Sequence, residues 1–237
     1  MIGKRYAAEV VGTFGIVFAP VALSATGQMP NGASGLLAAA LVSGLSVLAM
    51  IYALGPVSAA HFNPAVTLGF AVAKRFSWRY VPGYVASQLV GALLAASFAA
   101  VLFGTGHGTH VPTGTGIQNV GTEFVLSFLL MLVIIAVATD KRVGSAVPAL
   151  AIGLTVVFCV LIGGPITGGS MNPARSAGPA LISGSVALSN LWLYLLVPPL
   201  GAMAGALVYE SLRIDRESAV GAPNELSEAL SELCEQG

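Results

Sequence analysis

Two copies of the tripeptide Asn-Pro-Ala are the residues of this sequence best suited to chemistry, at Asn63-Pro64-Ala65 and Asn172-Pro173-Ala174. Asparagine followed by proline favours the start of a helix. The asparagine oxygen accepts from free backbone N–H groups, and proline lacks the N–H that would be unpaired there. The asparagine NH2 group remains available as a donor. Because both copies lie in apolar sequence, they predict helix starts that present polar donors inside a membrane.

Arg175 lies three residues after the second asparagine, at the positive end of its predicted helix, where a positive charge is disfavoured. An arginine at that depth needs carbonyl groups or water as partners. Two interpretations are open: a structural arginine bound to loop carbonyls, or a donor at the constriction of a pore.

Three more ionisable residues lie in apolar surroundings: Glu9, Glu123 and His61. The two acids occupy equivalent positions, and an intramembrane acid is a candidate functional group. They could support neighbouring loops or couple transport to protons. His61 could offer a donor or acceptor at the mouth of a pore, or be a packed core histidine. His107 and His110 belong to a Gly/Thr-rich connection, residues 104–119, which we expect to be a flexible surface loop and not a metal site.

The composition requires a lipid environment for these residues. Of 237 residues, 56% are hydrophobic and only 8% charged, whereas soluble domains carry about 25% charged residues. The mean hydropathy is +0.86. The net charge of zero gives no reason to expect nucleic acid as a partner. No catalytic motif or phosphate-binding loop is recognisable, so we expect neither an enzyme nor a bound cofactor or metal.

Six segments are long and apolar enough to cross a bilayer as helices: residues 7–25, 36–54, 81–103, 121–139, 146–163 and 191–209. Most of the Lys and Arg residues outside these segments lie in alternate connections, so that they fall on one side of the membrane. They are Lys4, Arg5, Lys74, Arg75, Arg79, Lys141, Arg142, Arg213 and Arg216. The positive-inside rule then predicts cytoplasmic N- and C-termini. We expect a channel domain over residues 1–212 and a cytoplasmic tail over residues 213–237.

The channel domain contains an internal repeat, about 4–103 and 119–212. Residues 44–71 align without gaps onto residues 153–180, with ten of 28 positions identical. Each unit holds three spans, so the second enters the membrane from the opposite face, and such inverted repeats place solute sites near the midplane. Pro56 and Pro165 are predicted to stop the second and fifth spans. The short apolar segments 65–73 and 174–182 then form re-entrant half-helices that meet centrally.

The segments His61-Phe62-Asn63-Pro64-Ala65-Val66-Thr67 and Gly169-Ser170-Met171-Asn172-Pro173-Ala174-Arg175-Ser176 resemble the paired motifs of the aquaporin, or major intrinsic protein, family. The resemblance implies an all-α membrane protein: a right-handed bundle of six transmembrane helices plus two half-helices. It also implies a homotetramer in the lipid bilayer of the cell membrane. Asn63 and Asn172 would bind the permeant molecule, and Glu9 and Glu123 would accept N–H groups of the re-entrant loops.

The resemblance places the family's outer selectivity filter on Ser43, Val160, Gly169 and Arg175. Water-selective members typically carry Phe and His where this chain has Ser43 and Val160. Small residues there resemble the nodulin-like intrinsic protein branch, which passes glycerol, urea and arsenous, boric or silicic acid. We therefore expect a passive channel for water and small uncharged solutes that excludes ions and protons. A strictly water-selective pore is the alternative, and a proton-coupled transporter using Glu9 and Glu123 is a less favoured one.

Overall fold

The computed structural model describes residues 2–26, 32–140, 143–144 and 147–213, and these ranges fold into helices without strands. Most of the predicted tail, residues 214–237, lies outside the described residues, as do Lys141 and Arg142. The helices, in chain order, are α1 (Ile2–Ala25), α2 (Ala33–Ser58), α3 (Pro64–Val72), the 3-10 helix η1 (Trp78–Tyr80), α4 (Val81–Phe103), α5 (Gly116–Thr139), α6 (Val147–Thr167), α7 (Pro173–Ser183), α8 (Ser185–Ser189) and α9 (Leu191–Leu212).

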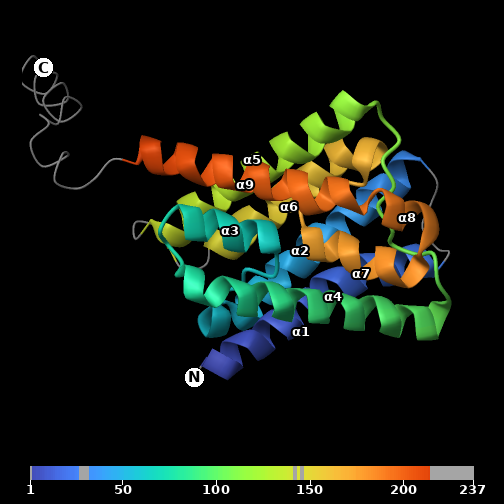
Figure 1. Cartoon of the computed structure of the whole chain (residues 1–237), viewed down its shortest axis with the longest axis horizontal. Helices are drawn as coiled ribbons and strands as arrows, with labels where there is room; N and C mark the ends of the chain where they lie inside the picture. Colours follow the sequence, from blue (N-terminus) through green and yellow to red (C-terminus); the bar gives the residue numbers. More distant parts are fainter. Residues whose placement is uncertain (1, 27–31, 141–142, 145–146, 214–237) are drawn as a thin grey trace, which may run out of the picture.

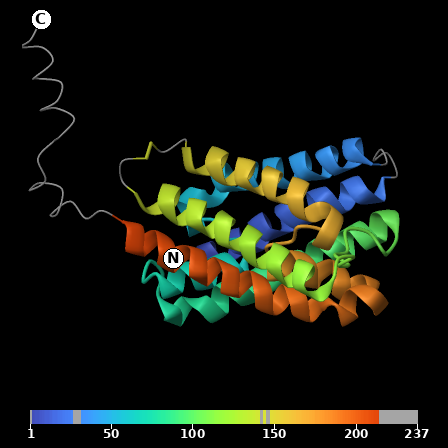
Figure 2. The same cartoon turned by 90° about the horizontal axis from the view of Figure 1, so that it is seen from above.

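Six of these helices, α1, α2, α4, α5, α6 and α9, are long and apolar enough to cross a membrane. They correspond one to one to the six predicted spans, and α4 has the predicted bounds. Figures 1 and 2 show them as a bundle in which α1 begins and α9 ends at the same end. We call this the near end of the bundle, and the opposite end, beside α8, the far end.

Pro56 and Pro165 do not end their helices, which corrects the prediction. Both prolines lie inside the last turn of α2 and α6. The α2 helix ends instead at Ala59, which has the left-handed conformation (φ 68°) and donates its N–H to the carbonyl oxygen of Gly55. A left-handed residue satisfies the last free carbonyl groups of a helix, so it sets the end more directly than the proline does.

The short helices α3 and α7 enter the bundle from opposite ends, and their N-terminal tips meet in the middle (Figure 1). Their observed bounds agree with the predicted half-helices within about one residue. Each half-helix packs mainly against a long helix of the other repeat, α3 against α9 and α7 against α4. This exchange ties the two repeats together around the meeting point.

Glycines set the closest helix crossings, and they do so at equivalent positions of the two repeats. The α2 and α6 helices cross at Gly44 and Gly153, where a Cβ atom on Gly44 would lie 2.4 Å from the Gly153 carbonyl oxygen. A Cβ on Gly91 would lie 2.4 Å from a carbonyl oxygen of α1, and one on Gly201 would lie 2.3 Å from a carbonyl oxygen of α5. Small residues that let helix backbones touch are typical of membrane bundles.

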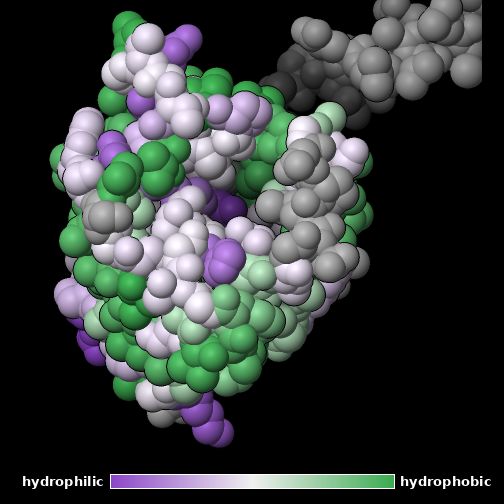
Figure 3. Space-filling view, turned by 90° about the vertical axis from the view of Figure 1, so that its right-hand side faces the viewer, coloured by the Kyte–Doolittle hydropathy of each residue, from purple (hydrophilic) through white to green (hydrophobic). Residues whose placement is uncertain are grey.

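The far end of the bundle is hollowed. Figure 3 looks at this end and shows hydrophilic and intermediate residues around a central depression, with hydrophobic surface gathered towards the periphery. Large apolar side chains are exposed along the long helices, for example Leu45, Leu94, Leu154 and Leu196. An apolar flank with a polar hollow at the end is the surface expected of a protein whose polar route runs along the bundle axis.

Candidate functional site

The chain before each half-helix follows the same unusual backbone path. Ala59, Ala60 and Phe62 have φ values of 68°, 52° and 50° before α3. The loop before α7 contains three such residues: Gly168, Gly169 and Met171 have φ values of 83°, 59° and 54°. Left-handed backbone is costly for residues other than glycine, so both loops need strong external support.

Glu9 of α1 supplies that support to the first loop. Its carboxylate accepts four hydrogen bonds, from Ser58 Oγ (2.7 Å), from the backbone N–H groups of His61 (3.0 Å) and Phe62 (2.7 Å), and from Gln88 Nε2 (2.8 Å). The side chain is fully buried. A carboxylate that receives this many donors is stabilised without a salt bridge.

Glu123 of α5 does the same for the second loop. It accepts from Thr167 Oγ1 (2.7 Å) and from the backbone N–H groups of Ser170 and Met171 (both 2.9 Å). Among the described residues, neither glutamate lines either of the two large cavities inside the bundle. The geometry therefore favours loop support over proton coupling, because a coupling acid must be reached by solute or water.

Asn63 and Asn172 lie where the two half-helices meet. Each side-chain oxygen caps its own helix, on the N–H of Ala65 (2.8 Å) and on the N–H of Ala174 (3.0 Å). Each NH2 group also crosses to the other loop: Asn63 Nδ2 donates to the Met171 carbonyl oxygen at 2.8 Å, and Asn172 Nδ2 to that of Phe62 at 2.9 Å. Since an NH2 group carries two hydrogens, each asparagine keeps one donor.

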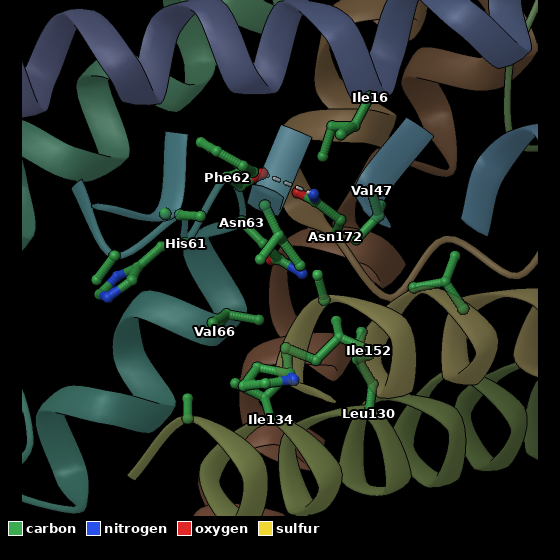
Figure 4. Close-up of a pocket in the computed structure, with 18 of the residues that line it drawn as sticks. Ile16, Val47, His61, Phe62, Asn63, Val66, Leu130, Ile134, Ile152 and Asn172 are labelled. Carbon is green, nitrogen blue, oxygen red and sulfur yellow. Dashed lines mark hydrogen bonds between the residues drawn. The ribbon is translucent and has the colours of Figure 1, made fainter. Parts of the chain in front are cut away.

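Two large cavities lie inside the bundle, and the one at the near end is lined by both asparagines. The near cavity has a volume of about 430 Å³, and Figure 4 shows Asn63 and Asn172 in it, with Ile16 and Val47 on one side and Ile134 on the other. The far cavity has a volume of about 390 Å³. Both cavities are lined by Ser43 and Arg175, so these two side chains stand where the cavities adjoin.

Arg175 is held at that junction by three acceptors. Its Nη1 donates to the carbonyl oxygens of Gly169 (2.8 Å) and Ser170 (3.3 Å), and its Nη2 donates to Ser43 Oγ (3.3 Å). These contacts offset its unfavourable position at the positive end of α7. Arg175 binds loop carbonyl groups and also lines both cavities. A structural arginine and a donor inside the passage, the two interpretations left open by the sequence, are therefore compatible.

The other predicted filter positions gather around Arg175. Val160 of α6 lines the far cavity, and the backbone of Gly169 packs against it, since a Cβ on Gly169 would lie 3.1 Å from Val160 Cα. Ser43, Val160, Gly169 and Arg175 thus come together from α2, α6, the second loop and α7. The ring formed by these four residues contains no aromatic side chain.

His61 lines the near cavity and is buried against Phe70, Phe76 and Tyr84. Its Nδ1 atom is 3.1 Å from Thr67 Oγ1. Figure 4 shows it on the first loop, on the side of the cavity away from Ile152. His61 therefore fits both interpretations of the sequence, because it packs against aromatic side chains and also lines the near cavity.

His110 was expected in a flexible surface loop, and this prediction is wrong. The side chain is only 7% exposed, contacts Ser176 Oγ through Nδ1 at 3.0 Å, and lines the far cavity. Burial and the nearby charge of Arg175 lower the pKa of His110 well below 6.5. No group of potential metal ligands occurs among the described residues. Sequence reasoning missed His110 because it lies 66 positions from its partner, in a segment rich in glycine and threonine.

The electrostatics of the meeting point are positive. Two helix N-termini point at it, each equivalent to roughly half a positive charge, and Arg175 adds a full one. No Asp or Glu is among the described residues that line either cavity. Such a passage repels cations and offers hydrogen-bond donors to neutral oxygen atoms.

These features define a class of protein: a six-span membrane channel with two half-helices that meet at its centre. The family model described as "Major intrinsic protein" matches residues 2–209. The chain belongs to the major intrinsic protein family and is a multi-pass integral membrane channel, not an enzyme.

Comparison with known proteins identifies individual relatives. The chain is 45% identical over 214 residues to Aquaporin NIP1-1 of Oryza sativa subsp. japonica, covering 89% of this chain and 74% of the relative. It is 43% identical to Nodulin-26 of Glycine max, covering 89% and 78%. The X-ray structure of the aquaglyceroporin from Plasmodium falciparum has the same fold, with a TM-score of 0.78, 22% identity, and coverage of 90% of this chain and 97% of that one.

Proposed function

We propose that this protein is a passive transmembrane channel for water and small uncharged hydroxylated or amide solutes. Glycerol, urea and arsenous, boric or silicic acid are the solutes we expect. The observation that supports the proposal is that Ser43 and Arg175 line both cavities, with Val160 on the wall of the far one and no aromatic side chain among these residues and Gly169. The Arg175 donor lies beside the small Ser43 side chain there, so we expect a solute wider than water to pass while Arg175 binds its oxygen.

The near cavity supports the same proposal. One part of its wall is apolar, with Ile16, Val47 and Ile134, and another carries the donors of Asn63 and Asn172 (Figure 4). Glycerol and the neutral acids also combine hydroxyl groups with less polar surface. The apolar wall can contact the less polar surface of such a solute while the asparagine donors bind its hydroxyl oxygen atoms. Both contacts reduce the free-energy cost of taking the solute out of bulk water.

A strictly water-selective pore is the second candidate, and it is less well supported, because no bulky side chain narrows the ring. A proton-coupled transporter would need an acid that exchanges protons with the passage. Glu9 and Glu123 lie outside both cavities and accept hydrogen bonds from loop donors.

The cellular arrangement belongs to the same proposal. We infer that both chain termini are cytoplasmic, so that the near cavity opens to the cytoplasm and the far cavity to the outside of the cell membrane. Residues 1–212 would form the channel and residues 213–237 a cytoplasmic tail. Four copies would assemble in the bilayer, each with its own passage.

A filter exchange tests the proposed selectivity. Replacing Ser43→Phe together with Val160→His adds bulk on two walls of the ring. Stopped-flow measurements on proteoliposomes should then show glycerol, urea and arsenous acid permeability falling at least tenfold, while water permeability stays within about twofold. If glycerol passes the double variant as fast as the wild type, the ring is not the selectivity filter.

A further inference from the structure

The two repeats differ in how a histidine reaches each half-helix. In the first repeat, His61 contacts Thr67 Oγ1, four residues after Asn63. The residues at the equivalent positions in the second repeat are Ser170 and Ser176. A serine is too small to fill the place of the His61 ring.

His110 fills the corresponding place from a different part of the chain. It contacts Ser176, the equivalent of Thr67, at 3.0 Å. Its ring also lies 5.5 Å from that of Tyr194, as the His61 ring lies 5.0 Å from that of Tyr84. Both tyrosines donate to the carbonyl oxygen of the last residue of a helix, Ser58 of α2 and Thr167 of α6, which are equivalent positions. The connection between the repeats therefore supplies the second of two pseudo-equivalent histidines, one beside each cavity.

The hydrogen bonds around Ser176 fix the direction of the His110 contact. Ser170 Oγ donates to the Asn172 carbonyl oxygen at 3.0 Å, so it can only accept from Ser176 Oγ, 2.5 Å away. Ser176 has then used its one hydrogen and must accept from His110 Nδ1–H. In the neutral imidazole, Nε2 is left with a lone pair.

His110, which carries this lone pair, lines the far cavity together with Arg175. Gly169 O, Ser170 O and Ser43 Oγ already accept from Arg175. Among the described contacts, Nε2 of His110 has no protein partner, and the residue lines the far cavity. A solute that sheds water there needs an acceptor for its own hydroxyl hydrogens as well as a donor for its oxygen.

We propose that His110 is a specificity-determining residue of the far cavity, whose Nε2 accepts a hydroxyl or amide hydrogen of the solute while Arg175 donates to a solute oxygen. This inference rests on the proposed channel function and adds an acceptor outside the four-residue ring. The ionisable groups that face His110 from the elements around it are Arg175 of α7 and Tyr194 of α9, with Glu123 of α5 behind the second loop. The lowered pKa of His110 keeps the ring neutral, as an acceptor requires.

Two substitutions separate the acceptor from the structural contact. His110→Asn can place an amide N–H near the position of Nδ1 and so keep the contact with Ser176, but it has no atom at the position of Nε2. His110→Gln extends an amide oxygen to about the position of Nε2. His107→Asn is a matched control, because this histidine is on the same loop but lines neither large cavity.

Stopped-flow measurements on proteoliposomes should show glycerol permeability reduced about threefold to tenfold in His110→Asn, the range expected for one lost hydrogen bond. Water permeability should change by less than about twofold, because water is small enough to keep other partners. His110→Gln should recover at least half of the wild-type glycerol permeability, and His107→Asn should match the wild type for both solutes.

Equal glycerol permeability in His110→Asn and the wild type would overturn the inference. A parallel loss of water and glycerol permeability in both His110 variants would also overturn it, since this would indicate a purely structural histidine. Failure of the proposed function is distinguishable, because the wild type itself would then conduct neither water nor glycerol above the level of protein-free vesicles.

Discussion

Glu9 shows how one buried side chain can determine the shape of a passage it does not touch. Its four accepted hydrogen bonds hold the left-handed first loop, which in turn directs Phe62 and Asn63 to the centre. An acid in this role has to remain an acceptor. Its energetic contribution is to loop geometry, and its effect on transport is indirect.

Glu9→Gln should lower the stability of the protein by about 1–3 kcal/mol, because an NH2 group would then oppose a backbone N–H of His61 or Phe62. The measurement is thermal unfolding of the detergent-solubilised protein. Thr13→Val is the control: Thr13 Oγ1, one turn further along α1, is buried without a hydrogen-bond partner in the described structure, so its removal should cost little. Equal stability of Glu9→Gln and Thr13→Val would contradict the loop-support role.

The protonation of His110 gives a second test at the level of single residues. Its pKa is lowered well below 6.5 by burial and by Arg175, so the ring is neutral above that value and gains a proton only in stronger acid. Glycerol permeability should therefore be constant between about pH 6.5 and pH 8 and fall only under acidic conditions. A decline centred near pH 7 would show that His110 titrates normally and is not shielded as the structure indicates.

At the scale of helices, the crossing of α2 and α6 depends on the absence of side chains at Gly44 and Gly153. Gly44→Ala would place a methyl group 2.4 Å from a carbonyl oxygen, so the helices must separate. We expect a lower unfolding temperature than the wild type. Gly121→Ala in α5, where nothing lies within 4 Å of the added atom, should be neutral or slightly stabilising. If both variants unfold at the wild-type temperature, the crossing is not close-packed.

The elements could be predicted well because their causes are local. Apolar length defines a span, and Asn-Pro defines the start of each half-helix. The ends of α2 and α6 were predicted too early, because a left-handed residue after the proline ends each helix. That conformation depends on the carboxylates of Glu9 and Glu123, which are distant in sequence, so the prolines alone do not reveal it.

Prediction of the site had a similar limit. Arg175 and the two asparagines are recognisable from their spacing, and the repeat alignment relates the residues around them. His110 has no such signal, since it replaces a ring that the second repeat lacks and comes from the connection between the repeats. A residue that replaces a missing side chain of one repeat from outside that repeat is recognisable only when the two repeats are superposed in space.

At the scale of the whole molecule, the inverted repeat brings two positive helix ends together at the near cavity, close to Arg175, which stands where the near and far cavities adjoin. Cations are repelled there, whereas neutral oxygen atoms find donors. The exchange of half-helices, α3 onto α9 and α7 onto α4, packs each tip against a long helix of the other repeat. Passive passage of neutral solutes is the property that such a positive passage supports, since no Asp or Glu lines it among the residues that the structure describes.

The most direct test is glycerol uptake by proteoliposomes containing the wild-type protein, measured with equal pH on both sides and again with an imposed pH difference. The account predicts uptake far above that of protein-free vesicles, equal rates in the two conditions, and no accompanying proton flux in a pH-sensitive dye trapped inside. Uptake that follows the pH difference, or vesicles no more permeable than bare lipid, would contradict it.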